Sequence, residues 1–207
     1  MATDKEVRII WHGHSCFEIQ SEDAVIVFDP FEEVPGYKPL SLEADLVLCS
    51  HEHADHNARD RVKLSGRSVD EDVHVDILET FHDDFEGQER GKNKIHIITI
   101  AGKRIAHMGD LGHALSHEYE DQLKDLDVMM IPVGGHYTID ADVAGMVVKS
   151  TNPAITVPMH YRTDDAGFDV ISTIDPFAEQ FENVHRLDSS DFAVGEQEPG
   201  LVILKKP

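Results

Sequence analysis

The chain has 207 residues, of which 41% are hydrophobic and 28% charged, so we expect one globular domain over residues 1–207 and exclude fibrous, collagen-like and disordered proteins. Eighteen Lys and Arg against 40 Asp and Glu give a net charge of −22. A surface of this sign repels the phosphates of nucleic acids and anionic lipids, so neither is an expected partner.

Short apolar runs separated by turn residues predict strands through most of the chain. The first three, at residues 7–11, 16–20 and 24–29, are expected to form an antiparallel meander. The continuous apolar run at residues 44–50 is typical of a strand buried on both faces. Further strands are predicted at residues 73–81, 94–100, 103–109, 127–133, 154–159 and 200–206.

Three helices are predicted in the second half of the chain. One begins at Ser116 and runs to about residue 124, with Glu118 and Glu120 in its first turn, where negative charge suits the helix dipole. The others cover residues 140–149 and 175–181. Because strands come first and strands alternate with helices later, the sequence favours an α+β fold of layered sheets with helices outside.

No segment is predicted to cross a membrane, because the longest apolar runs fall far short of the ~18 residues that a span needs. The N-terminal residues resemble neither a secretory signal nor a transit peptide, so the expected location is cytoplasmic. The two cysteines, Cys16 and Cys49, each stand beside an apolar residue in a strand-like run. We expect both to be buried free thiols.

The densest group of metal-ligand residues is the sequence HEHADHN at residues 51–57, in a chain with 14 histidines. On a strand, His51, His53 and Asp55 would share one face, and on a helix His51 would pair with Asp55 and leave His53 aside. A loop that leaves the carboxyl end of a strand can bring all three together with His56. Imidazole and carboxylate groups are ligands for zinc and other borderline divalent metals.

Three further ligand-type residues follow predicted strands in the same way. His82 comes after ILETF, Asp110 after RIAHMG and His160 after ITVPM. Each alone is equally well explained as a capping or hydrogen-bonded polar residue. Together with the loop, they give five histidines and two aspartates, which is enough for two metal ions.

These motifs resemble a known family. HEHADH is similar to the His-x-His-x-Asp-His signature of the metallo-β-lactamase superfamily. WHGHSCFEI, HDDFEGQERGKNK, HMGDLGH, MMIPVGGHYTIDA and PMHY resemble the branch that includes ascorbate-6-phosphate lactonase and many uncharacterised hydrolases, and the similarity covers residues 9 to about 162. The resemblance implies a four-layer αββα sandwich, with two mixed sheets face to face and metals at one edge.

The resemblance also implies a ligand set. One ion would be held by His51, His53 and His82, the other by Asp55, His56 and His160, and Asp110 would bridge them. Zinc is the expected metal, with manganese or iron as alternatives, and two such ions can bring a bridging water to a pKa of roughly 7. We therefore expect a metal-bridged hydroxide to hydrolyse a lactone, ester, amide or phosphodiester in a small-molecule substrate, anionic ones included.

Other residues near these motifs are weaker candidates. Catalytic roles are predicted for Asp55, as a group that orients or accepts a proton, and for His14 and His113, each with a structural hydrogen-bonded histidine as the alternative. Asp83 is a candidate for orienting a ligand imidazole. The predicted substrate contacts are Arg90, His136 and Tyr137. Structural or exposed positions are predicted for His74, His96, His107, His117 and His185.

Two other functions remain open from the sequence. Some members of the superfamily are di-iron redox proteins, but those that reduce oxygen or nitric oxide resemble His-x-Glu-x-Asp-His, whereas His53 stands at that position here. Nitrogen ligation favours zinc over iron. The other alternative is a non-catalytic metal-binding protein. Because relatives of the lactonase often assemble, a homo-oligomer is a further expectation.

Overall fold

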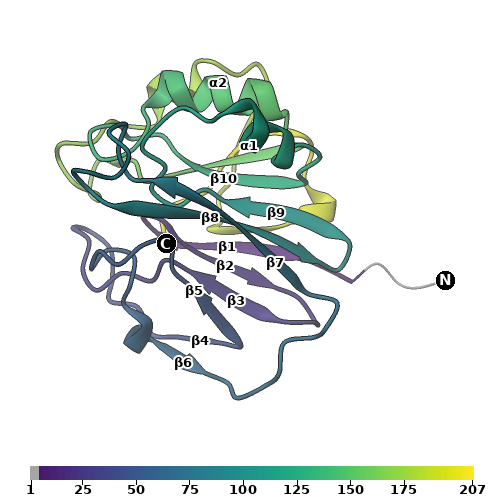
Figure 1. The fold of residues 1–207 in the computed structure, drawn as a ribbon. Coiled ribbons are helices and arrows are strands. Elements are labelled where there is room, and N and C mark those ends of the chain that lie inside the picture. Colours follow the sequence, from purple (N-terminus) through teal and green to yellow (C-terminus); the bar gives the residue numbers. More distant parts are fainter. Residues whose placement is uncertain (1–4) are drawn as a thin grey trace.

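Two β-sheets pack face to face in the computed structural model, which describes residues 5–207 (Figure 1). The first sheet has the strand order β13–β1–β2–β3–β5. Its strands are β1 (Arg8–Gly13), β2 (Cys16–Gln20), β3 (Val25–Phe28), β5 (Leu46–Leu48) and β13 (Asp191–Ala193). The predicted meander of β1, β2 and β3 is confirmed, because these strands pair antiparallel, and β5 joins β3 in parallel.

The second sheet has seven strands in the order β12–β14–β11–β10–β9–β8–β7. β8 pairs antiparallel with both β7 and β9, whereas β9, β10, β11, β14 and β12 run parallel. β7, β9 and β11 therefore point in the same direction. The strands are β7 (His74–Phe81), β8 (Lys92–Ile100), β9 (Lys103–His107), β10 (Val128–Pro132), β11 (Ile155–Met159), β12 (Val184–Arg186) and β14 (Gly200–Ile203).

The helices are α1 (His117–Gln122), α2 (Ala141–Thr151) and α3 (Asp175–Ala178). α1 and α2 cover the face of the second sheet that points away from the first sheet (Figure 1). Both begin as predicted, because the side chains of Ser116 and Asp140 accept hydrogen bonds from backbone N–H groups in the first turn. α2 buries Ala144 and Val147 on one face and ends at Asn152, which has a left-handed conformation.

The outer face of the first sheet carries a different layer. A two-stranded sheet of β4 (Leu42–Ala44) and β6 (Val62–Leu64) lies there with the 3-10 turn η1 (Arg59–Arg61), below β3 and β5 in Figure 1. Together with the proline-rich loop before β4, it buries a small apolar cluster that includes Val27, Phe31 and Val34. The α+β sandwich of two packed sheets is thus confirmed, with this layer on one side and helices on the other.

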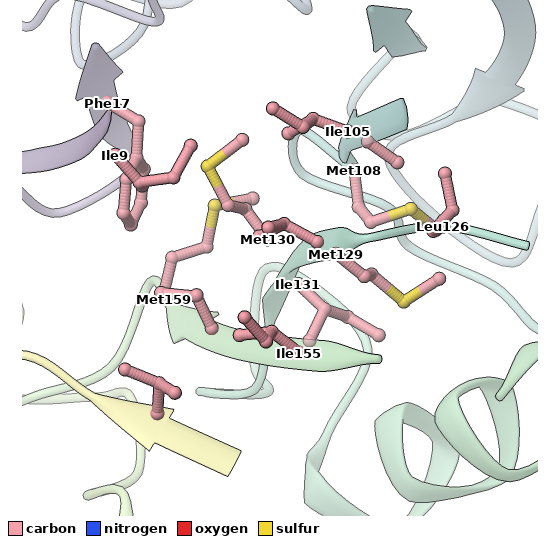
Figure 2. Close-up of a cluster of buried hydrophobic side chains, with 14 of the residues drawn as sticks. Ile9, Phe17, Ile105, Met108, Leu126, Met129, Met130, Ile131, Ile155 and Met159 are labelled. Carbon is pink, nitrogen blue, oxygen red and sulfur yellow. The ribbon is translucent and has the colours of Figure 1, made fainter. Parts of the chain in front are cut away.

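The main core lies between the sheets and under the helices. Ile9 and Phe17 of the first sheet belong to the same buried cluster as Met130 and Met159 of the second (Figure 2). All five residues of β10 are buried. Such a continuous apolar run is typical of a parallel strand covered on both faces, and the central strands of this sheet therefore hold the loops at their ends in fixed positions.

Several sequence predictions need correction. Residues 44–50 do not form one strand buried on both faces, because β5 covers only Leu46–Leu48 at the edge of the first sheet and its residues are half-buried. The three-residue strands β4, β6, β12 and β13 were not predicted, nor was the second 3-10 turn η2 (Val194–Glu196). Cys16 and Cys49 are buried and free, as expected. Among the described residues, no helix has the length and apolarity required to cross a bilayer.

Candidate metal centre

The predicted ligands meet at one edge of the sandwich. Because β7, β9 and β11 run in the same direction, the residues that follow them emerge at the same edge of the second sheet. The loop after β5 brings the HEHADH motif to that edge from the first sheet. These loops supply His51, His53, Asp55, His56, His82, Asp110 and His160.

The first group of donors consists of His51, His53 and His82. The ring centroids of His51 lie 4.6 Å from those of both His53 and His82, and the His53 and His82 rings are 5.1 Å apart. One nitrogen from each ring lies within 4.8 Å of the other two. The trio that the resemblance implies for one ion is therefore assembled.

The second group contains Asp55, His56 and His160, and His14 joins them. Asp55 Oδ2 is 3.7 Å from His56 Nε2 and 3.5 Å from His14 Nε2. The rings of His14 and His160 are 4.1 Å apart. His14, His56 and His160 are almost wholly buried.

Asp110 lies between the two groups. Its Oδ2 atom is 3.2 Å from His56 Nε2, 3.1 Å from His160 Nε2 and 3.3 Å from His82 Nε2. The side chain is buried and its Oδ1 atom has no hydrogen-bond partner among the described residues. A carboxylate in contact with imidazoles from both groups has the position that a bridging ligand requires.

The donor set fits divalent metal ions. Two donor atoms bound about 2.1 Å from one zinc ion lie roughly 3.0 to 3.4 Å apart, which is close to the spacings around Asp110. Buried polar atoms are normally hydrogen-bonded, yet His51 Nε2 and His56 Nε2 have no hydrogen-bond partner within residues 5–207. Unpaired nitrogens aimed at a carboxylate are the chemistry of a cation site.

The remaining ring nitrogens of three predicted ligands are held by hydrogen bonds. His56 Nδ1 lies 2.8 Å from Asp29 Oδ2, and His82 Nδ1 lies 3.0 Å from the carbonyl oxygen of Tyr137. His51 Nδ1 is 2.9 Å from Ser50 Oγ, which itself donates to Asp29. Acceptors on Nδ1 place the proton there and leave Nε2 free to bind a metal.

Burial and neighbouring charges set the protonation of the centre. Burial, together with the adjacent His56, lowers the pKa of His51 to about 3, so its imidazole is neutral at pH 7. Burial opposes ionisation of Asp110, but His160 and His56 outweigh it and hold the pKa of Asp110 well below its usual range. Burial also opposes a charged His56, but Asp110 and Asp29 raise the pKa of His56 well above its usual value.

Asp29 is a site residue that sequence reasoning missed. It is fully buried, and its carboxylate accepts hydrogen bonds from the backbone N–H and hydroxyl of Ser50, at 2.7 and 2.6 Å, besides its contact with His56. The signal was present, since Asp29 follows the apolar strand β3 just as His82 follows β7. The same pattern therefore identifies both a ligand and the residue that orients the ligands.

Asn93 is a second unpredicted supporting residue. Its side-chain oxygen accepts a hydrogen bond of 2.9 Å from the backbone N–H of Asp110, and its amide nitrogen donates to Thr80 and to the carbonyl of Met108. It lies in β8, just before the predicted strand at residues 94–100, and its side chain is fully buried. Asn93 thus fixes the backbone that carries Asp110.

Three residues at the centre have strained backbone conformations. His14, Asp29 and His160 have φ angles of 51°, 44° and 53°, in the left-handed region that residues other than glycine rarely adopt. Such conformations persist where the surrounding structure imposes them, and they cluster at functional sites. A close approach supports His160, because a Cβ on Gly134 would lie 2.1 Å from the His160 carbonyl oxygen.

A pocket of about 350 Å³ opens onto these donors. Arg90 and Tyr137, two of the predicted substrate contacts, line it, and the Arg90 guanidinium lies 5.8 Å from the centre of the Tyr137 ring. Phe168 also lines the pocket and was not predicted. The pocket reaches donors of both groups, namely His53, Asp55, His82, Asp110 and His160.

Other predicted residues lie elsewhere. His113 and His136 line a neighbouring hollow and do not line the metal pocket. His113 accepts a hydrogen bond from the N–H of Phe81 at Nε2 and donates from Nδ1 to the carbonyl of Ala114. Both nitrogens therefore have backbone partners, as the structural alternative for His113 predicts.

Asp83 also differs from its prediction. Its carboxylate accepts four backbone N–H groups of the loop that follows, from Phe85, Gly87, Glu89 and Arg90, at 2.7 to 3.1 Å. These bonds form the loop that carries Arg90 to the pocket. Asp83 thus orders a loop, whereas Asp29 and Ser50 orient the ligand imidazoles.

Histidines predicted as structural or exposed have those positions. His107 is buried, donates a hydrogen bond to the Ser15 carbonyl and stacks on Phe28 with ring centroids 5.0 Å apart. His96 is buried as well, and His74 and His117 are exposed. None of these four belongs to the groups that could hold an ion in the described part of the chain.

Comparisons with known proteins agree with this fold. A family model described as the beta-lactamase superfamily domain matches residues 8–160. The chain is 32% identical over 195 residues to a metal-dependent hydrolase of Thermoplasma acidophilum, covering 78% of this chain and 86% of that protein. A metal-dependent hydrolase of Thermoplasma volcanium is 31% identical, with coverage of 86% and 91%.

A solved structure extends the comparison to the whole chain. The crystal structure of a proposed Zn-dependent hydrolase of the metallo-β-lactamase superfamily from Thermotoga maritima matches with a TM-score of 0.79 and 31% identity, covering 97% of this chain and 100% of that chain. Two packed sheets with a His/Asp cluster at one edge thus define a metallo-β-lactamase fold. The chain belongs to the β-lactamase superfamily, in the same family as the two Thermoplasma metal-dependent hydrolases.

Proposed function

We propose that this protein is a dinuclear metal-dependent hydrolase that cleaves a lactone, ester, amide or phosphodiester bond in a small molecule. The observation that carries the proposal is the position of Asp110. One carboxylate oxygen lies 3.1 to 3.3 Å from imidazole nitrogens of three histidines drawn from both donor groups. The relatives, which are metal-dependent or Zn-dependent hydrolases by name, support hydrolysis.

In this proposal each donor group holds one ion. His51, His53 and His82 hold the first, Asp55, His56 and His160 hold the second, and Asp110 bridges. Nitrogen-rich ligation favours zinc, in agreement with the zinc dependence proposed for the Thermotoga maritima hydrolase. Bound there, two divalent ions would make a water acidic enough to ionise near neutral pH and would polarise the bond to be cleaved.

Asp55 has a second role in the proposal. Burial opposes its ionisation, but contact with His14 and His56 holds the pKa of Asp55 below its usual range. The side chain also lines the pocket. An ionised carboxylate at the pocket wall can orient the attacking water and accept its proton.

The pocket favours a small substrate with an apolar part and a negative charge. Tyr137 and Phe168 provide an apolar wall, with ring centroids 6.2 Å apart. Arg90 adds a guanidinium, which binds carboxylates and phosphates through paired hydrogen bonds. A second hollow of about 330 Å³ shares His53 and Arg90 with the pocket and adds Lys92 and Lys94 against one acidic residue, Glu52. In a chain of net charge −22, this local excess of cations supports an anionic substrate.

The test begins with protein purified without chelators. Elemental analysis is expected to find two ions per chain, with zinc predominant, and an absorption spectrum without iron bands would exclude the di-iron alternative. A panel of 4-nitrophenyl esters, small lactones and bis(4-nitrophenyl) phosphate should then reveal turnover that EDTA abolishes and zinc restores. His51→Ala should lose turnover, whereas His117→Ala, at an exposed position, should keep it. Turnover that persists after the metal has been removed would refute the proposal.

A further inference from the structure

The turn between β1 and β2 places His14 inside the metal centre. Gly13 has a φ of 113°, and a Cβ there would lie 2.4 Å from the Tyr37 ring, so only glycine fits. His14 itself has a φ of 51°. Its carbonyl oxygen accepts hydrogen bonds from the Trp11 indole at 3.0 Å and from the His160 N–H at 3.4 Å. The turn is therefore held from two sides, and it directs the imidazole inward.

The His14 imidazole is buried without a partner. Its exposed fraction is 0%, and neither ring nitrogen has a hydrogen-bond partner among the described residues. The ring lies 4.1 Å from that of His160 and 5.5 Å from that of His56. Because buried polar side chains are normally paired, two unpaired nitrogens among metal-ligand residues indicate a partner that is not a protein group.

The distance from His14 to Asp55 distinguishes a direct hydrogen bond between them from shared binding of one metal ion. His14 Nε2 lies 3.5 Å from Asp55 Oδ2, which is longer than the usual 2.7 to 3.2 Å of an N–H···O hydrogen bond. It is close to the roughly 3.0 to 3.4 Å between two donors on the same zinc ion. Another pair of the same group, His56 Nε2 and Asp55 Oδ2, has a similar separation of 3.7 Å.

A direct substrate contact does not explain His14. The pocket is lined by Asp55, His160 and Phe168 among others, whereas the fully buried His14 does not line it. The Phe168 ring meets that of His14 edge-on, with centroids 5.5 Å apart. His14 thus lies among the donors of the second group without facing the pocket.

We propose that His14 Nε2 is a ligand of the second metal ion, beside Asp55, His56 and His160. This inference rests on the proposed dinuclear centre and adds a donor that the family signature does not contain. The two positions are then unequal, because the first has three imidazoles, whereas the second has three imidazoles and the carboxylate of Asp55, and both share Asp110. The second ion should therefore be the one that the protein releases last.

The test compares zinc binding by wild type, His14→Gln and His12→Gln. Glutamine can still donate a hydrogen bond to Asp55 but lacks the imidazole, so it separates a ligand from a residue that only positions Asp55. His12 contacts Glu18 on the neighbouring strand and is the matched control. Each protein is dialysed against buffers of graded free zinc, and bound zinc is counted by elemental analysis. Thermal unfolding in EDTA checks that the variants fold alike.

We expect His14→Gln to bind one of its two ions about 100-fold more weakly or worse, since changes outside the ligand shell already cost about 10- to 100-fold. His12→Gln should match wild type. Equal affinity of His14→Gln and wild type for both ions would overturn the inference. If the wild type itself held fewer than two ions, the dinuclear centre of the proposed function would be refuted. That result is seen in wild type and is therefore distinct from a failure of the inference on His14, which is seen in the variant.

If the variants do not fold, a measurement on the wild-type protein can still decide whether His14 is a ligand. X-ray absorption at the zinc edge counts the imidazoles per ion in the dizinc protein. With His14 bound, six imidazoles serve two ions and the average is three, whereas without it the average is two and a half. The lower value would overturn the inference.

Discussion

The core around Met130 and the metal centre around Asp110 are both buried, but the core consists of packed apolar side chains and the centre of polar side chains with unpaired atoms. In the core, apolar side chains from both sheets pack against one another (Figure 2). In the metal centre, imidazole nitrogens and a carboxylate oxygen are buried without hydrogen bonds from the described residues, and three residues have left-handed backbones. The core stabilises the fold by itself, whereas the centre is stabilised only when a cation occupies it.

The comparison teaches that stability and function are separable in this molecule. The strands of the second sheet hold the loops, and their packing does not depend on the ligands at their ends. Changes in the core should therefore lower the free energy of unfolding with little effect on metal affinity. Changes in the centre should lower metal affinity with little effect on the free energy of unfolding of the metal-free protein.

The largest effect is expected for Asp110→Asn, which keeps the shape of the side chain and removes its charge. Metal binding should weaken and turnover should fall by about 1,000-fold or more, which corresponds to the several kcal/mol that metal ions contribute to such reactions. Elemental analysis and initial rates measure both. Asp142→Asn, on the exposed side of α2, is the control. Full metal content and activity in Asp110→Asn would refute the bridging position.

The converse change is Met130→Ala in the core. Removing this fully buried side chain should lower the free energy of unfolding by about 2 to 5 kcal/mol. Zinc affinity of the folded protein should remain that of wild type. Urea unfolding followed by zinc titration tests both, with the exposed Met146→Ala as the control. A large loss of zinc affinity would show that core and centre are coupled after all.

A smaller effect is expected for Asp29→Asn, since Asp29 orients ligands and does not bind the ions. Loss of the carboxylate weakens its contact with His56 and its hydrogen bonds with Ser50, so zinc affinity should fall by about 10- to 100-fold. Asp45→Asn is a matched control, because Asp45 is also a buried carboxylate but pairs with Arg67 at the small outer sheet. Unchanged affinity in Asp29→Asn would remove the orienting role.

The smallest effect concerns pH and a core histidine. Burial lowers the pKa of His96 to about 4, against about 6.5 in the unfolded chain. The unfolded state therefore binds the proton first, and stability should fall as pH decreases from about 6.5 towards 4. The contribution is about 1 kcal/mol per pH unit. Urea unfolding in EDTA should show that the free energy of unfolding falls less steeply with decreasing pH for His96→Gln than for wild type. His74→Gln, at an exposed position, should follow wild type.

Most of the fold was predictable because its strands are long apolar runs with turn residues between them. β8 and β10 have this pattern, and both are interior strands of the second sheet. The three-residue strands β4 and β6 were missed because so short a segment has no readable alternation. β5 was predicted too long because its apolar residues pack at a sheet edge, where burial is partial. Such differences arise from tertiary contacts, which local sequence does not contain.

The ligand positions were predictable because a strand that ends in a His or Asp delivers that side chain to the edge of a sheet. His82 and His160 follow this rule, and so does Asp29, whose role required the position of His56 to be known. Asp83 and His113 belong to the same motifs, but Asp83 bonds to backbone N–H groups of its own loop and His113 bonds to the backbone of Phe81 and Ala114. A sequence names the residue types that a loop brings to the centre. Which of them face inward is decided by the turn.

The donors come from both sheets, and this has a mechanical consequence. The HEHADH loop follows β5 of the first sheet, whereas His82, Asp110 and His160 follow strands of the second. Bound ions would therefore cross-link the two sheets along this edge, through loops that are far apart in sequence and without any disulfide. Removing the metal should make these loops open more often. Their amide hydrogens should then exchange faster with solvent, while those of β10 stay protected.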